Sequence, residues 1–158
     1  MHFEGDFEVL VHLFKKQQLL ATGNSAHKAI RPLLLILSGT MRGVYGGGQV
    51  SALENFGLQD AFDSVIGVST GAPTAAYFLA RQAHEGTRIY SEECTKSDFI
   101  SLRRFFAGGP LADTAYLARV FRGEMSRQAL DQSAIQASRT DFFVGVTCAR
   151  SGKGELVD

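Results

Sequence analysis

The stretch Gly67-Val68-Ser69-Thr70-Gly71 joins an apolar run, residues 62–68, to a segment that favours a helix, residues 74–82. A β-branched and aliphatic run that ends at a Gly-x-Ser-x-Gly turn and continues as a helix is typical of a nucleophile elbow, where a tight turn holds a serine hydroxyl outward. The sequence therefore predicts that Ser69 is a nucleophile at the carboxyl end of a strand. An ordinary turn with the same three letters is the alternative.

The two glycines of this turn, Gly67 and Gly71, have a steric role in the prediction. Because they lack Cβ atoms, the strand, the turn and the helix can approach closely. The backbone at Ser69 is expected to take an uncommon conformation. The N-terminal end of the following helix would favour negative charge that develops near the hydroxyl.

A second strand and turn precede this stretch. Residues 33–37 are apolar without alternation, the pattern of a strand buried on both faces of a parallel sheet, and residues 38–43 interrupt it with a glycine-containing turn. A helix is predicted over residues 49–56, before the strand at residues 62–68. This βαβα order predicts an α/β fold, a three-layer α/β/α sandwich around a mainly parallel sheet.

The remaining segments complete the predicted organisation. A leading helix over residues 7–20 and a polar connector make residues 1–31 a separate unit from an α/β domain of residues 32–158. Further helices are expected over residues 88–94, 99–106, 114–121 and 125–137, and a strand over residues 141–148 precedes a hairpin turn at residues 151–154 and a partner strand.

Composition limits the class of protein. A chain of 158 residues with 45% hydrophobic and 20% charged residues is one ordinary globular domain, which excludes disordered and fibrous classes. A formal net charge of zero and the lack of a basic run argue against nucleic acid as a partner. An acidic N-terminus and the lack of an apolar run of about 18 residues indicate a cytoplasmic protein without signal peptide or membrane span.

Cysteine and histidine usage excludes several kinds of site. Cys94 and Cys148 have no Cys-x-x-Cys spacing, so both are expected to be free thiols, and no metal or other cofactor is predicted. His84 is the only histidine after Ser69, and at about 1.5 Å rise per residue it would lie some 20 Å along the elbow helix, so a histidine base is disfavoured. The earlier histidines, His2, His12 and His27, are expected at the surface or at helix caps.

The turn after the first strand supplies the second half of the predicted site. Acyl transfer through a serine needs N–H donors aimed at the oxyanion, and backbone amides in a glycine-containing turn supply them. Neighbouring parallel strands end at one edge of the sheet, so residues 38–43 are expected beside Ser69. A phosphate site is disfavoured because no Gly-Lys-Ser/Thr sequence ends the loop. A loop needed only for tight packing of the helix on the sheet is a further alternative.

Residues 37–43, Leu-Ser-Gly-Thr-Met-Arg-Gly, and residues 67–71 together resemble the paired signatures of the patatin-like phospholipases, Gly-Gly-Gly-x-Arg-Gly and Gly-x-Ser-x-Gly. The strand at residues 143–147 and the turn at residues 151–153 are similar to the later core of that family. The resemblance covers residues 33–158. It implies a hydrolase of lipid esters, phospholipids or acylglycerols, that works through a Ser-Asp dyad with Ser69 as nucleophile and has no cofactor.

The resemblance also implies an oxyanion hole made by one loop, whose residues are Gly39, Thr40, Met41, Arg42 and Gly43. Within it, Arg42 would orient the loop by hydrogen bonds, for which its planar fork of donors is suited. Ser38 and Thr40 stand where the family has glycine. A β-branched Thr40 would be strained if the loop required positive φ at that position. Near the two turns, the apolar residues Met41, Val44, Tyr45 and Ala72 are candidates for an acyl pocket.

The aspartate of the dyad lies in an Asp-Gly-Gly or Asp-Gly-Ala turn in that family, and this sequence contains no Asp-Gly pair. We therefore expect the aspartate to be missing from the chain, which would be the N-terminal portion of such an enzyme, through truncation or as a fragment. The competing hypothesis is an inactive pseudoenzyme that serves as an interaction module. A sheet edge left exposed would promote self-association, and a lipid substrate would bring peripheral contact with a membrane.

Overall fold

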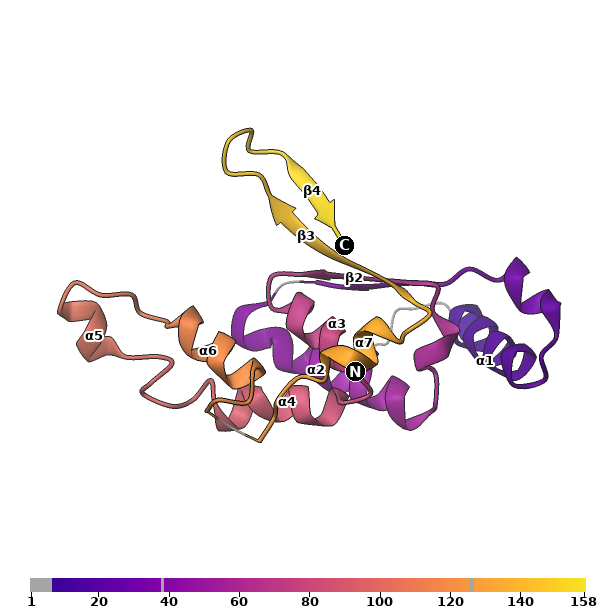
Figure 1. Ribbon diagram of the computed structural model, residues 1–158, viewed down its shortest axis with the longest axis horizontal. Helices are drawn as coiled ribbons and strands as arrows, with labels where there is room; N and C mark the ends of the chain where they lie inside the picture. Colours follow the sequence, from indigo (N-terminus) through magenta and orange to yellow (C-terminus); the bar gives the residue numbers. More distant parts are fainter. Residues whose placement is uncertain (1–6, 38, 126) are drawn as a thin grey trace.

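The computed structural model describes residues 7–37, 39–125 and 127–158, and of Thr40 the backbone only. A four-stranded sheet has the order β1 (Leu33–Ile36), β2 (Ser64–Val68), β3 (Asp141–Thr147) and β4 (Gly154–Val157). The strands β1, β2 and β3 run parallel, and β4 returns antiparallel to β3 as the predicted hairpin partner (Figure 1). The mainly parallel sheet of the predicted α/β fold is therefore confirmed.

The helices are gathered against this sheet. In Figure 1, α2, α3, α4 and α7 lie on the same side of it, so the sheet and one helical layer of the expected sandwich are present. The bounds of the helices are α1 Phe7–Ala21, α2 Gly43–Asn55, α3 Gly71–Leu79, α4 Ala83–Glu92, α5 Leu102–Phe106, α6 Thr114–Phe121 and α7 Gln132–Gln136. Three 3₁₀ turns are added to these, η1 Ser25–Ala29, η2 Thr40–Arg42 and η3 Gln59–Ala61.

Helix α2 begins six residues before the predicted start at residue 49, because tertiary packing overrides the low helix propensity of its glycines. A Cβ on Gly47 would lie 2.7 Å from Thr87 Oγ1, and one on Gly43 would lie 2.3 Å from Tyr90 Oη. Both neighbours belong to α4. The glycines therefore let two helices approach each other in a way that a side chain would prevent.

Other predicted helices also have different bounds, and the helix expected over residues 88–94 is α4, Ala83–Glu92. Ser101 caps α5 through Arg104 N–H, and Ile100 bridges to Ala112, so residues 99–101 are not helical. Asp131 caps α7, which leaves a helix only over the end of the predicted range 125–137. The elbow helix α3 ends at Leu79, and Arg81 with φ 58° separates it from α4. His84 consequently lies on α4 and not on the elbow helix.

The continuous apolar run of β1 predicts a strand buried on both faces, and this prediction is wrong. The strand lies at an edge of the sheet, and Leu33 and Leu35 are 55% and 51% exposed. Within the described residues only β2 pairs with it. Because side chains alternate between the two faces of a strand, Leu33 and Leu35 lie on the face opposite Leu34 and Ile36, away from the core under the helices. The apolar run predicts the hydrophobicity of this strand correctly, but it contains no information about which face of the sheet the helices cover.

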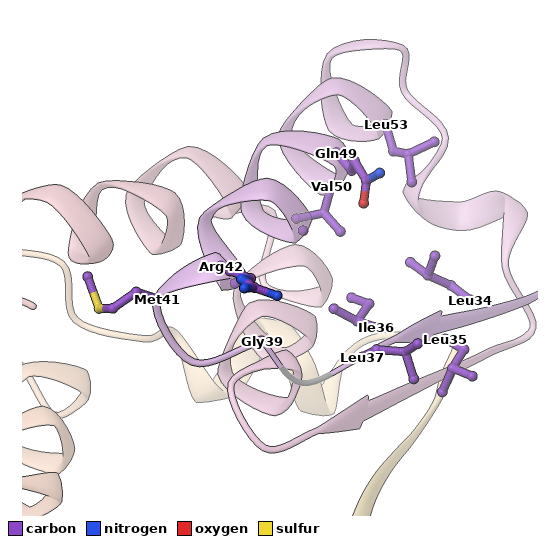
Figure 2. A pocket seen from close by; sticks show the side chains of 12 residues that line it. Leu34, Leu35, Ile36, Leu37, Gly39, Met41, Arg42, Gln49, Val50 and Leu53 are labelled. Atoms are coloured by element: carbon purple, nitrogen blue, oxygen red, sulfur yellow. The ribbon is translucent and has the colours of Figure 1, made fainter. Parts of the chain in front are cut away.

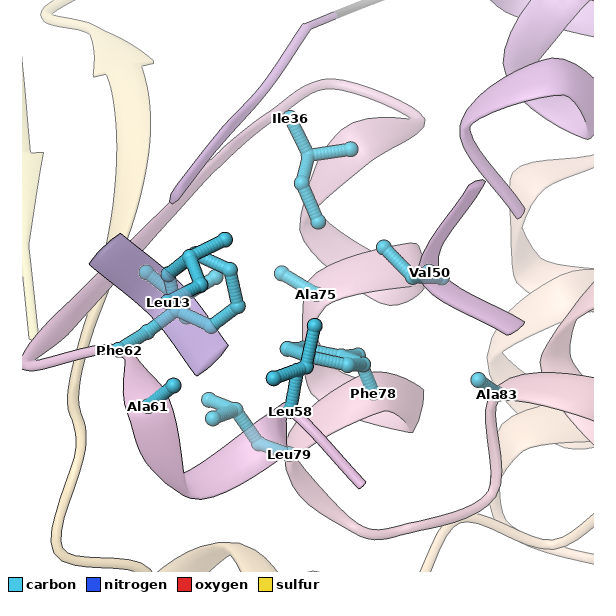
Figure 3. Packing of buried hydrophobic residues seen from close by; sticks show 11 residues of the cluster. Leu13, Ile36, Val50, Leu58, Ala61, Phe62, Ala75, Phe78, Leu79 and Ala83 are labelled. Carbon is cyan, nitrogen blue, oxygen red and sulfur yellow. The ribbon is translucent and has the colours of Figure 1, made fainter. Parts of the chain in front are cut away.

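The main core lies between the sheet and the helices α2 and α3 (Figure 3). Leu58, Val65 and Phe78 are fully buried in it. Helix α1 adds Leu13, and its neighbour Lys16 is buried and forms an ion pair with Asp63, just before β2. The leading helix is thus packed on the domain by an apolar contact and a salt bridge.

A second apolar cluster joins α3, α4 and α6, with Tyr77, Cys94 and Val120 among its buried members. The Tyr77 hydroxyl donates to the carbonyl of Gln128, and burial raises the pKa of Tyr77 to about 12. Burial likewise raises the pKa of Cys94 to about 11. Cys94 and Cys148 are both free, as the sequence predicts. Within residues 7–37, 39–125 and 127–158, none of the helices combines the length and hydrophobicity of a membrane-spanning segment.

We predict that Gly71→Ala lowers the free energy of unfolding by about 1–3 kcal/mol, the usual effect of overpacking. A Cβ at this position would lie 2.1 Å from the Ile36 carbonyl oxygen, which is backbone and cannot rotate away. The matched control is Gly48→Ala, because a Cβ on Gly48 meets nothing within 4 Å and alanine favours a helix. Urea unfolding followed by circular dichroism measures both, and equal effects of the two substitutions would contradict the prediction.

Candidate active site

Ser69 stands on the turn between β2, which ends at Val68, and α3, which begins at Gly71. Its φ is 55°, in the left-handed region that non-glycine residues rarely occupy, and the residue is exposed. The Ser69 carbonyl accepts a hydrogen bond from Ala72 N–H at 3.0 Å, which closes the turn. The local geometry is that of a strained strand-to-helix turn with its serine outward.

The elbow glycines have the close contacts that the sequence predicts. A Cβ on Gly67 would lie 2.5 Å from Ala72 Cα, and one on Gly71 would overlap the Ile36 carbonyl. The first contact lets the turn fold back on its own strand. The second lets α3 rest directly on the end of β1.

The loop after β1 meets the elbow at the carboxyl ends of the two neighbouring strands. The N–H of Gly39 donates to Thr70 Oγ1 at 3.2 Å, and the register pairs Ile36 with Gly67. The structure therefore brings the predicted oxyanion loop and the predicted nucleophile together. In this arrangement the Gly39 amide is paired with Thr70, and it would have to release that hydroxyl before it could bind an oxyanion.

The backbone of the loop continues as the 3₁₀ turn η2, in which Arg42 N–H donates to the Gly39 carbonyl at 2.8 Å. Because a 3₁₀ turn is right-handed, Thr40 does not need the positive φ that would strain a β-branched residue. Gly43 is buried at the start of α2. Ser38, the other departure from the glycine-rich pattern, lies outside the described residues.

Arg42 does not have the contacts that its predicted orienting role requires. Its side chain is exposed, and within the described residues no hydrogen bond holds its guanidinium. It lines a groove of about 740 Å³ between β1 and α2, together with Leu34, Leu35, Leu37 and Val50 (Figure 2). Met41 lies at the same end of the groove and also reaches the next cavity.

That second cavity, of about 200 Å³, is apolar and reaches the elbow. Its lining includes Thr70, the residue after Ser69, and Met41 of the loop after β1, and the rest of the lining includes Tyr77, Ile89, Tyr90, Cys94, Phe99, Leu117 and Phe121. Tyr90 Oη is 3.2 Å from Thr74 Oγ1 and 3.3 Å from the Thr70 carbonyl, and burial raises the pKa of Tyr90. Of the four apolar residues predicted to line an acyl pocket, this lining includes Met41 and not Val44, Tyr45 or Ala72.

No side chain in the described part of the chain hydrogen-bonds to the Ser69 hydroxyl as a base would. His84 Nε2 is 3.3 Å from Oδ1 of Asn55, the last residue of α2. Two aspartates serve as helix caps: Asp113 accepts from Tyr116 N–H, and Asp131 accepts from the N–H groups of Ser133 and Ala134. The hydrogen bond from the Ser133 hydroxyl lowers the pKa of Asp131. Among the residues described, no group of three histidine, cysteine or acidic side chains could hold a metal ion.

Known proteins match this chain over most of its length. The model of the patatin-like phospholipase family matches residues 34–156. The uncharacterized protein YjjU of Escherichia coli (strain K12) is 25% identical over 128 residues, which are 77% of this chain and 36% of that protein. The chain therefore spans little more than a third of the length of this relative. No solved structure gives a significant match. Because the family match extends over most of the chain and includes both the loop and the elbow, the chain belongs to the patatin-like phospholipase family.

Proposed function

We propose that this chain is the nucleophile-bearing part of a lipid acyl hydrolase, in which Ser69 attacks the acyl carbon and backbone amides of residues 39–43 bind the oxyanion. The hydrogen bond between Gly39 N–H and Thr70 Oγ1, 3.2 Å long, carries this proposal. It joins the two loops at one end of the sheet, so an ester carbonyl placed over the exposed Ser69 hydroxyl would also lie near the amides.

In the proposed reaction, Ser69 Oγ forms a bond to the ester carbon and the carbonyl oxygen gains negative charge. The amides of the loop and the N-terminal end of α3 are suited to stabilise this charge. The hydroxyl proton needs an acceptor, which the family resemblance implies is an aspartate. Since general-base assistance typically contributes about 10²–10⁴ in rate, the chain by itself is expected to react slowly.

The substrate class follows from the apolar cavity beside the elbow. Its lining from Thr70 to Phe121 is almost entirely hydrophobic, which suits an acyl chain and not a charged headgroup. An apolar cavity of about 150 Å³ holds a six-carbon ring, so the room here corresponds to a chain of roughly eight carbons. We therefore propose that the cavity holds the acyl chain of a lipid ester while its carbonyl lies at Ser69.

We predict that a fluorophosphonate probe labels Ser69 slowly, because no base contacts its hydroxyl among the described residues. Labelling should be lost in Ser69→Ala and retained in Ser91→Ala, which removes an exposed serine hydroxyl from α4. Intact-protein mass spectrometry measures the modified fraction over time. Well-folded protein that is not labelled above the level of Ser69→Ala would contradict the proposed nucleophile.

We predict that Leu117→Trp slows labelling by an octyl fluorophosphonate roughly tenfold and leaves ethyl fluorophosphonate labelling within about twofold. A tryptophan in the cavity displaces at least two methylene groups of the octyl chain, and burial of each contributes about 0.8 kcal/mol to binding. The matched control is Leu130→Trp: both leucines pack on the same apolar cluster, but only Leu117 lines the cavity. Equal slowing by both variants, or of both probes, would contradict the assignment of the acyl pocket.

A second candidate function is an interaction module, favoured by the exposed edge of β1. An unpaired strand edge can accept another strand. Leu33, Leu35 and Leu37 are exposed, and Leu35 and Leu37 line the groove of Figure 2. Pairing of this edge with a second copy of the chain would give the self-association that the sequence predicts. This function requires no reactive serine.

We predict that Leu35→Lys lowers the dimer fraction of the chain at micromolar concentration, because a lysine on an edge strand opposes strand pairing. Leu156→Lys is the control, since Leu156 is comparably exposed on β4 at the opposite edge of the sheet. Analytical ultracentrifugation measures the dimer fraction. If Leu156→Lys alone reduces it, the association uses the β4 edge, and the β1 edge is not the interface.

A further inference from the structure

The segment of residues 99–112 projects from the helical layer and presents apolar side chains to solvent. It contains α5, which lies at one end of the long axis, opposite α1 (Figure 1). Phe106 is 82% exposed, and Leu102, Phe105 and Leu111 are also exposed. The rings of Phe105 and Phe106 pack edge to face, with centroids 5.7 Å apart. The two exposed rings thus contact each other and are not buried in a hydrophobic core. We call residues 99–112 the arm.

The arm is held in shape by polar contacts. The Arg104 guanidinium donates to four backbone carbonyls, those of Phe99 at 2.7 Å, Pro110 at 2.8 Å, Asp98 at 3.2 Å and Leu111 at 3.4 Å. The bridge between Ile100 and Ala112 closes the base of the arm. Hydrogen bonds to a charged donor are among the stronger ones in proteins. The arm is therefore ordered without burying its tip, which leaves the apolar side chains free to bind something else.

The chemistry of the tip fits a lipid surface. The arm contains two arginines and no acidic residue, and Arg103 is exposed beside the two phenylalanines. Aromatic and leucine side chains next to arginine are the composition of segments that insert into the headgroup region of a bilayer. An exposed arginine adds attraction to anionic lipids. A cluster of exposed apolar groups of this kind marks an interaction surface and not ordinary solvent exposure.

The arm also connects this tip to the apolar cavity. Phe99, Ile100, Leu111 and Ala112 line the same apolar cavity as Thr70, the residue after Ser69. One short segment thus has a solvent-facing tip and an inner wall that leads toward Ser69. We propose that the arm docks on an anionic lipid surface and that its inner wall receives the acyl chain of a lipid held in that surface. The docking stands on the arm alone, and the second half rests on the proposed function.

Helix α1 offers a rival apolar surface and supplies the matched control. Phe7 is 76% exposed, and Val11 is exposed one turn further along the helix. These residues lie at the other end of the molecule (Figure 1), and neither lines the cavity. If exposed apolar side chains bound lipid regardless of their position, the arm and α1 would contribute equally to vesicle binding.

The test is co-sedimentation of the full chain with vesicles of phosphatidylcholine, with and without phosphatidylglycerol. We expect the double variant Phe105→Ser/Phe106→Ser to bind at least about tenfold more weakly, since partial burial of two phenylalanine rings is lost. The control Phe7→Ser/Val11→Ser should bind as the unmodified chain does. Arg103→Gln should lose the preference for phosphatidylglycerol and keep binding to phosphatidylcholine. Circular dichroism melting curves establish that each variant is folded.

Three outcomes would overturn the proposal. Unchanged vesicle binding of the arm variant, or weaker binding only of the α1 variant, would remove the arm as the docking surface. Loss of self-association in the arm variant, with no vesicle binding by the unmodified chain, would make the arm a protein interface instead. Ser69→Ala separates this proposal from the proposed function, because the variant should bind vesicles as the unmodified chain does. If the unmodified chain binds vesicles through the arm but is not labelled by a fluorophosphonate, the docking proposal stands and the proposed hydrolase function fails.

Discussion

The approach of Gly71 to the carbonyl of Ile36 is the constraint on which the site depends. No side chain fits between them, so the first turn of α3 rests on the backbone at the end of β1. The elbow and the loop after β1 are thereby brought to one place, where Gly39 N–H reaches Thr70 Oγ1. The loop ends at Gly43 and the elbow begins at Gly67, 24 residues later. They meet because glycine at position 71 lets the start of α3 pack against the end of β1.

Sequence reasoning succeeded where the structure depends on local patterns. The helix over residues 114–121 has the predicted bounds because Asp113 caps it within the same turn. The hairpin of β3 and β4 follows from a turn at Gly152, whose φ of 68° suits glycine. The strain at Ser69 could be predicted because the elbow motif specifies a backbone conformation along with its residues.

The failures have a common physical origin in contacts between distant segments. The glycines at residues 46–48 suggest a loop, but Thr87 fills the space beside Gly47 and makes a helix favourable. The apolar spacing of residues 99–106 suggests a longer helix, but Arg104 holds the carbonyls of Phe99 and Pro110 in another conformation. The apolar cavity beside the elbow could not be predicted from the motifs, because most of its lining comes from residues between 73 and 121 that carry no motif.

The backbone conformation at Ser69 does not depend on the presence of a catalytic base. A non-glycine residue with positive φ costs about 1–3 kcal/mol and persists only where its surroundings impose it. Here the surroundings are α3, with Tyr77, Phe78 and Leu79 all buried, and the close contacts of Gly67 and Gly71. None of these contacts involves a base. The scaffold can therefore present the hydroxyl whether or not an acceptor for its proton is in place. An active hydrolase and an interaction module would share this fold, and only the reactivity of the serine separates them.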